Sequence, residues 1–218
     1  KKYNIQKVKS ASLNAIEGKW SGLVQHLATT LTSSLDTIVL TLRSTMTNVS
    51  IYNVYAFPLN GIRVLVESVS GGYKSYLGNL LVDEDRGKVE KEFAKFELGI
   101  HFIGTIFLAT ATKMLVYFIN IYTRGVNDAN YNNKLFAMLM IWAYFIMIIR
   151  IPYTTIFNAA GHFKQTQKYS IIEVIINVVI SFCAVAKLGL IGITIGTCLA
   201  VGYRMIAFVA YLKQSILY

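Results

Sequence analysis

The sequence has few charged residues, few prolines and few cysteines, and each shortage argues against a class of protein. Charged side chains make up 15% of the 218 residues, whereas a soluble globular domain has about 25%. So little charge argues against a soluble enzyme and against a disordered segment. Two cysteines and three histidines argue against a disulfide-rich secreted domain and a zinc module. We therefore expect a polytopic membrane protein without catalytic chemistry.

Apolar residues, by contrast, are abundant and fall into six segments. Hydrophobic side chains make up 55% of the chain, and its mean hydropathy is +0.50. Each segment is close to the ~20 residues that a helix needs to cross a bilayer, and none alternates like a barrel strand. The sequence therefore predicts an all-α fold of six transmembrane helices, with a soluble helical bundle as the alternative. The six segments are residues 26–46, 51–77, 96–122, 134–159, 168–187 and 189–212.

The formal net charge of +10 comes from lysines and arginines that punctuate the apolar segments. This placement is typical of topology signals and not of a nucleic-acid-binding stripe. Cationic loops stay in the cytoplasm, so both ends of the chain are predicted to be cytoplasmic. The mixed-charge stretch 78–95 is predicted to be a helical cytoplasmic connector along the membrane surface. It is either a docking site or a solvated connector.

Ionisable residues inside the apolar segments are the strongest functional signal. A charge at mid-bilayer costs roughly 2.5–3.5 kcal/mol even on a lenient scale, so each needs a partner, a wet cavity or a route to the interface. Together they indicate a hydrated cavity between the helices. Two alternatives stay open: Arg63 and Glu67 neutralise one another, or the residues nearer the helix ends reach the headgroups. The buried candidates are Asp36, Arg63, Glu67, Lys113, Arg150, Glu173 and Arg204.

Proline and glycine add two further expectations. Pro58 is expected to interrupt the second segment and Pro152 the fourth, because proline lacks a backbone N–H group. Such breaks either line a cavity or serve packing only. Gly192, Gly196 and Ala200 lie at four-residue spacing, which lets another helix approach closely. Both cysteines lie in apolar runs and are expected to be buried free thiols.

Residues 149–204 resemble the C-terminal half of bacterial polysaccharide flippases, in the multidrug/oligosaccharidyl-lipid/polysaccharide exporter superfamily. Upstream, SSLDTIVL at 33–40 resembles the first helix of the same half, and YTRGVNDANY at 122–131 resembles its outer loop. The order and spacing of these pieces carry the resemblance, since no single motif is diagnostic. In the first stretch the matching pieces are Pro152, AAGHFKQTQ at 159–167, Glu173, Asn177, Ser181 and GLIGITIGT at 189–197.

The resemblance implies that residues 1–218 form one six-helix lobe of a two-lobe transporter, with the N-terminal lobe missing. The implied substrate is an oligosaccharide repeat unit linked to undecaprenyl pyrophosphate, which is flipped across the membrane by alternating access. No cofactor is implied beyond possible coupling to an H⁺ or Na⁺ gradient. The candidate substrate-binding residues are Arg150, Arg63, Lys113, Arg204, Tyr153 and Asn158, and the candidate ion-coupling residues are Asp36, Glu67 and Glu173.

Two other functions stay open from the sequence. One is an ion-coupled drug or metabolite antiporter of the same superfamily, although several arginines do not suit a cationic drug. The other is a non-transporting membrane scaffold for polysaccharide assembly. The expected partners are lipid-linked oligosaccharide, membrane lipids, the N-terminal lobe and a polysaccharide polymerase or glycosyltransferases, and no nucleic acid is expected.

Overall fold

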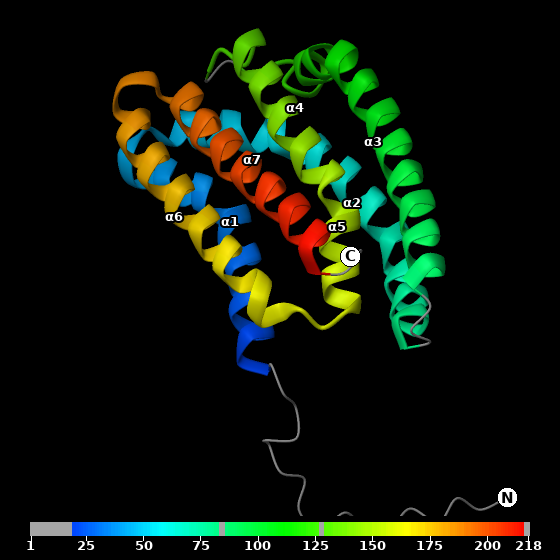
Figure 1. Cartoon of the computed structure of the whole chain (residues 1–218). Coiled ribbons are helices and arrows are strands. Elements are labelled where there is room, and N and C mark those ends of the chain that lie inside the picture. The colour runs from blue at the N-terminus through cyan, green and yellow to red at the C-terminus, as the bar shows by residue number, and fades with distance from the viewer. Residues whose placement is uncertain (1–18, 83–85, 127–128, 216–218) are drawn as a thin grey trace, which may run out of the picture.

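The computed structural model describes residues 19–82, 86–126 and 129–215, and these form a bundle of helices without a strand (Figure 1). This confirms the all-α fold that the apolar segments predict. The helices are α1 (Lys19–Arg43), α2 (Met46–Val82), α3 (Arg86–Tyr122), α4 (Lys134–Ile149), α5 (Ile151–Ala159), α6 (Phe163–Leu188) and α7 (Leu190–Ser215).

The helices pack so that α6 and α7 make the most extensive contact of the bundle. Figure 1 shows α1 beside α6 at one edge and α3 at the opposite edge, with α7 and α4 between them. Figure 1 shows that α1, α3 and α6 end at one end of the bundle, and that α2 and α5 end at the other. This up-and-down course brings the start of α1 and the end of α7 to the same end.

Within the described residues, four helical stretches are long and apolar enough to cross a membrane: α3, α4 together with α5, α6 and α7. The chain is therefore a helical protein with the features of a multi-pass membrane protein. The first two of the six expected spans do not reach the same apolarity. In α1 the cause is a high content of serine and threonine, and in α2 it is the charges of Arg63, Glu67 and Lys74.

The span built from α4 and α5 is broken at Arg150, as Pro152 predicts. Asn133 caps the start of α4, where its side chain accepts the Phe136 N–H at 3.0 Å. At the break, Nε2 of His101 on α3 lies 2.9 Å from the carbonyl oxygen of Ile149. A side chain from a neighbouring helix thus contacts the backbone where the helix is interrupted.

Two local expectations differ from the structure. α2 continues without a break through Pro58, so the chain tolerates the missing N–H inside a helix there. The described parts of the stretch 78–95 do not form a separate surface helix, because residues 78–82 extend α2 and residues 86–95 begin α3. α3 therefore has 37 residues and is about 55 Å long, well beyond the ~30 Å hydrocarbon core.

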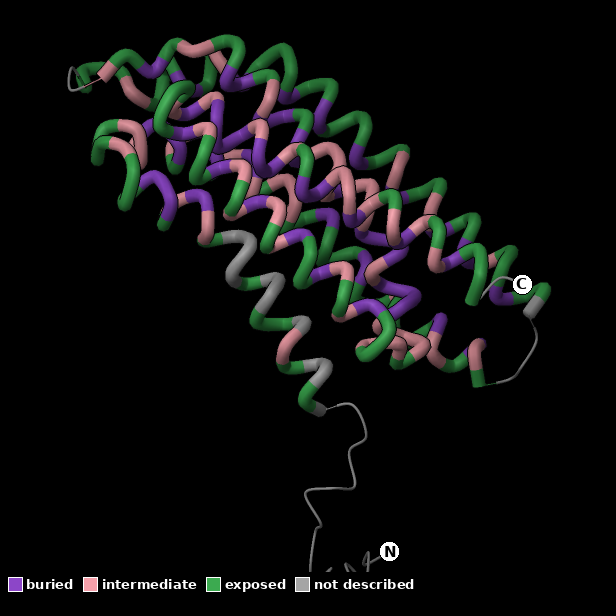
Figure 2. The backbone as a smooth tube through the Cα atoms, turned by 60° about the vertical axis from the view of Figure 1, so that its left-hand side comes forward, coloured by how far each residue is buried: buried purple, intermediate pink, exposed green. Residues whose placement is uncertain are grey.

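The burial pattern of α6 is the reverse of that of a soluble helix. Its buried positions carry mostly polar side chains, whereas large apolar residues such as Ile175 (55% exposed) and Val179 (56% exposed) face outward. Figure 2 shows exposed positions recurring along the outer helices of the bundle. Apolar outside and polar inside is the arrangement that lipid as a solvent favours. The buried residues of α6 are Thr166, Ser170, Glu173, Asn177, Ser181 and Val185.

The small residues of α7 explain how α6 and α7 approach so closely. A Cβ atom at Gly192 would lie 2.6 Å from the backbone carbonyl of Ala184, and one at Gly196 would lie 2.9 Å from the backbone nitrogen of Ser181. Both separations are too short for a real side chain. The expected small-residue contact is therefore the α6–α7 interface. Both cysteines are free as expected, but Cys183 is exposed on the outside of α6 and is not buried.

Candidate functional site

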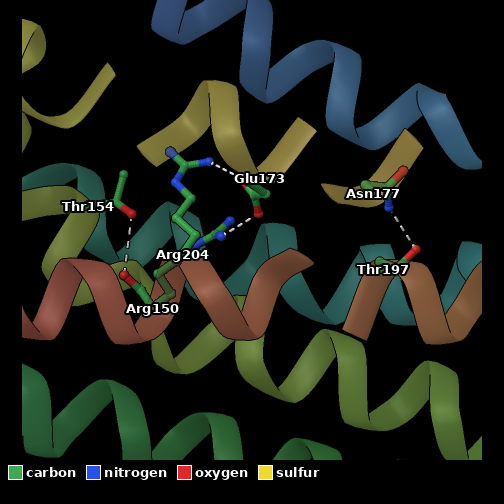
Figure 3. Close-up of polar contacts among 6 residues, drawn as sticks. All are labelled: Arg150, Thr154, Glu173, Asn177, Thr197 and Arg204. Atoms are coloured by element: carbon green, nitrogen blue, oxygen red, sulfur yellow. Dashed lines mark hydrogen bonds and ion pairs between the residues drawn. The ribbon is translucent and has the colours of Figure 1, made fainter. Parts of the chain in front are cut away.

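Glu173 lies between two arginines in the interior of the bundle (Figure 3). Nη1 of Arg150 lies 2.6 Å from one carboxylate oxygen, and Nη1 of Arg204 lies 2.5 Å from the other. The side chain of Glu173 is 0% exposed, that of Arg204 2% and that of Arg150 12%. One acid therefore compensates two cations, and the cluster keeps an excess positive charge.

We call Arg150, Glu173 and Arg204 the arginine cluster. Each of its members comes from a different element. Glu173 belongs to the polar face of α6, and Arg204 faces it from α7. Arg150 lies at the α4–α5 break, where the hydroxyl of Thr154 donates to its carbonyl oxygen at 3.3 Å. Since the interruption places Arg150 at the junction of two helices, its position relative to Glu173 depends on where the span breaks.

A pocket of about 250 Å³ opens beside this cluster and is bounded by α2, the α4–α5 break, α5 and α7. Its α2 wall presents charged residues at four- and seven-residue spacing, which places them on one helical face. Nε of Arg63 lies 3.6 Å from the Glu67 carboxylate. The polar and charged residues that line the pocket are Arg63, Glu67, Ser70, Lys74, Arg150, Thr154, Thr155, Asn158 and Arg204.

The pocket carries a net positive charge. Four cations line it against the single acid Glu67, with Glu173 directly behind two of them. Two buried donors make no hydrogen bond within the described part of the chain: Nε of Arg204, and Nε of Arg63, whose ion pair with Glu67 is 3.6 Å long. Buried N–H groups without a partner are rare because each costs about 1–3 kcal/mol. A cation-rich pocket with spare donors suits an anionic ligand with several acceptor oxygens.

A second buried acid, Asp36 on α1, is held in a different way. It is 3% exposed, and no described cation pairs with it. Instead it accepts hydrogen bonds from the Tyr52 hydroxyl at 2.7 Å, the Thr197 hydroxyl at 2.7 Å and the Asn177 amide at 3.2 Å. We call these four residues the Asp36 network. It joins α1, α2, α6 and α7 through neutral donors alone.

The arginine cluster and the Asp36 network share α6. Glu173 and Asn177 are four residues apart and therefore lie one helical turn apart on the same face. Figure 3 shows Asn177 reaching Thr197 of α7, with a separation of 3.1 Å, along the same helix pair that holds Glu173 and Arg204. The two buried acids thus lie along one polar seam between α6 and α7.

The structure brings together four of the six residues expected to bind substrate. Arg150, Arg63, Arg204 and Asn158 line the pocket. Lys113 does not, because it lies exposed on α3 and faces a groove against the start of α4. Its place within an apolar segment could be predicted from the sequence, but the side of the helix that it occupies could not.

Tyr153 also lies outside the pocket lining. Its hydroxyl donates to the Glu97 carboxylate on α3, on the side of α5 away from the Arg150 pocket. Among the residues expected to couple an ion, Asp36 is fully enclosed, Glu67 is exposed in the pocket and Glu173 is the partner of two arginines. The three acids therefore have three different environments.

Several residues of the site, Thr154 of the pocket among them, are absent from the candidates that the sequence suggested. Lys74 lies seven residues after Glu67, on the same face of α2, and that spacing was a usable signal. Thr197 likewise lies seven residues before Arg204 on α7. Tyr52 and Asn177 carried no such signal toward Asp36, because their contacts join helices far apart in the sequence.

Comparison with known proteins adds no relative. No protein-family model, no curated protein and no solved structure matches the chain. What is established is therefore an all-helical chain whose four apolar helices are typical of a multi-pass membrane protein.

Proposed function

We propose that this chain is one lobe of a transporter that moves a lipid-linked anionic oligosaccharide across a bacterial cytoplasmic membrane. The observation that carries the proposal is the pocket lined by Arg63, Lys74, Arg150 and Arg204 in the interior of the bundle. A diphosphate needs cations to leave water for such a site. The resemblance of residues 149–204 to polysaccharide flippases supports undecaprenyl pyrophosphate as the carrier.

Different residues of the site are proposed to bind the phosphates, to bind the sugar and to position the arginines. Arg63 and Arg150 present guanidinium groups at the pocket, and planar guanidinium groups bind phosphate oxygens in pairs. Glu173 is a positioning residue, since it holds Arg150 and Arg204 in place without lining the pocket. Asn158 and Thr154 on α5 supply amide and hydroxyl groups for the sugar hydroxyls nearest the phosphate.

Asp36 is the proposed coupling residue. A carboxylate enclosed without a cation carries an uncompensated charge, which a proton or a small cation would neutralise. Its partners come from three other helices, α2, α6 and α7, so neutralising it changes contacts that tie these helices to α1. We propose that the inward-facing and outward-facing states differ in the occupancy of Asp36.

The charge of the pocket separates this proposal from a drug antiporter. A cationic drug would meet four cations and only one lining acid, an arrangement that repels it. A scaffold role would leave the buried charges without a purpose, although each ionised group inside a membrane costs stability.

The proposal is tested with the protein that contains this chain, reconstituted in liposomes with a fluorescent oligosaccharide on undecaprenyl pyrophosphate. Chemical quenching from outside measures how fast the label changes leaflet. We expect Arg150→Gln and Arg63→Gln each to slow flipping by about tenfold, since each removes a charge-assisted contact worth about 1.5–3 kcal/mol.

The matched control is Arg124→Gln, which removes an exposed arginine at the turn after α3. It is expected to flip at the parental rate. Parental rates in both Arg150→Gln and Arg63→Gln would refute the anionic-substrate proposal. Loss of flipping in Arg124→Gln as well would show that the assay reports net charge and not the pocket.

A further inference from the structure

A groove between α3 and α4 lies apart from the pocket lined by Arg63, Arg150 and Arg204, which we call the arginine pocket. The groove has two sections. The first, about 310 Å³, lies beside Thr105, Leu108, Trp142 and Phe145 and is almost wholly apolar. The second, about 430 Å³, lies toward the turn after α3 and is polar at its rim. Both sections are continuous, because three residues line both: Thr112, Met138 and Ile141.

The groove closes at one end because α3 and α4 touch there. Gly104 of α3 is buried, and a Cβ atom in its place would lie 2.6 Å from Cγ2 of Ile148 on α4. Beyond this contact the groove runs between the two helices toward the turn that joins them, with the smaller section first and the larger section nearer the turn.

The section of the groove toward the turn after α3 carries two lysines. Lys113 on α3 and Lys134 at the start of α4 line the same section and are both exposed. Neither forms an ion pair with any residue in the described ranges. Asn120 and Asn132 add amide groups beside them, and the positive end of the α4 dipole lies at Lys134. This end is a cationic mouth with spare donors.

The section of the groove nearer Gly104 is lined mostly by apolar side chains and suits an apolar chain. Leu108, Ala109 and Trp142 line it, and the indole of Trp142 is 56% exposed although it stacks on Phe145 with ring centroids 5.6 Å apart. From Thr105 to Thr112 the groove follows α3 for about 10 Å. Both α3 and the α4–α5 stretch are among the helices that can cross a membrane, so the groove opens into lipid.

We propose that this groove binds an anionic glycerophospholipid of the surrounding leaflet. The phosphate lies between Lys113 and Lys134, and one acyl chain follows the apolar section past Trp142. Charge complementarity selects the headgroup, since a basic residue near a membrane surface attracts anionic lipid. The site does not depend on the proposed transport of a diphosphate, because it shares no residue with the arginine pocket.

Trp142 provides the readout. The protein is reconstituted in phosphatidylcholine that contains increasing amounts of brominated phosphatidylglycerol or brominated phosphatidylcholine, whose acyl bromines quench a nearby indole. The Trp142 signal is the part of the fluorescence that Trp142→Phe removes. We expect half-maximal quenching at an about thirtyfold lower mole fraction of the anionic lipid, in keeping with two basic contacts of about 1 kcal/mol each.

The double variant Lys113→Gln/Lys134→Gln is expected to quench equally with both lipids. Ala109→Phe fills the apolar section, so it is expected to reduce quenching by either lipid while the exposed lysines stay in place. The matched control is Lys187→Gln at the same end of the bundle, which keeps the preference.

Three outcomes would overturn the proposal. The first is equal quenching by both lipids in the parent protein. The second is a preference that survives in Lys113→Gln/Lys134→Gln, which would place the anionic lipid elsewhere. The third is loss of the preference in Lys187→Gln, which would make it a general effect of net charge. Flipping rates of Arg150→Gln decide the transport proposal independently.

Discussion

Glu173 and Asp36 are two buried acids along the polar seam between α6 and α7, yet one has charged partners and the other has neutral partners. Glu173 meets two guanidinium groups within 2.6 Å. Asp36 meets three neutral donors and no described cation. An acid between cations fixes those cations and stays ionised. An acid among neutral donors carries a charge that its surroundings do not cancel, so it is the one suited to gain or lose a proton.

The largest expected effect is that of Glu173→Gln. The change leaves Arg150 and Arg204 facing each other without a counter-charge, and breaking a buried ion pair costs about 3–5 kcal/mol. The free energy of unfolding in mixed detergent–SDS micelles measures the loss. Glu67→Gln is the matched control, because it breaks a pair whose acid is 47% exposed. A loss in Glu173→Gln no greater than in the control would remove the distinction between the two acids.

A substitution at the α6–α7 contact comes next in size. Gly196→Ala puts a methyl group against the backbone of Ser181, and overpacking of this kind costs about 1–3 kcal/mol. Gly202→Ala adds the same methyl group to α7 where nothing lies within 4 Å, so its unfolding free energy stays near that of the parent. If both variants are equally stable, α6 and α7 are not packed as closely at Gly196 as the structure indicates.

Asp36→Asn is expected to cost only about 1 kcal/mol, since it removes a charge but keeps a polar side chain of the same shape. Oδ1 of Asn177 is buried without a partner in the described structure, and an amide at position 36 can donate to it. Measured in the same micelles, the cost should be well below that of Glu173→Gln. The variant should also lose any dependence of flipping on pH or Na⁺. An unchanged dependence would exclude Asp36 as the coupling residue.

The smallest expected effect on stability is that of Arg63→Gln. Its ion pair with Glu67 is 3.6 Å long and partly exposed, and such pairs contribute about 0–1 kcal/mol. The same variant should nevertheless slow flipping strongly, since Arg63 lines the pocket. A variant that loses stability and transport in proportion would make Arg63 a structural residue instead of a binding one.

Much of this arrangement follows from the sequence, and the remainder depends on contacts between distant residues. The apolar runs predict where the helices lie, and the ionisable residues within them predict a polar interior. The buried polar face of α6 was also readable, because Thr166, Ser170, Glu173, Asn177 and Ser181 recur every three or four residues. Helical periodicity predicts on which face of its own helix a side chain lies. It does not predict which other helix that face contacts.

Which helix each face meets depends on packing that no local pattern encodes. The pairing of Glu173 with Arg150 and Arg204 spans 23 and 31 residues, and that of Asp36 with Thr197 spans 161. Lys113 is, like Arg150, an ionisable residue inside an apolar segment, yet it is exposed on α3 and does not line the pocket. The continuity of α2 through Pro58 is likewise a tertiary effect, since the local rule predicts a break.

The length of α3 has a consequence for the aqueous side of the membrane. Its apolar part begins near Phe96, so residues 86–95 extend the helix by about 15 Å beyond that part. Exposed Glu90, Lys91 and Lys95 give this extension charges of both signs, whereas Val89 and Phe93 are buried in the bundle. With the apolar part in the bilayer, the extension projects from the membrane surface. A macromolecule that approaches there meets these charges before it meets lipid.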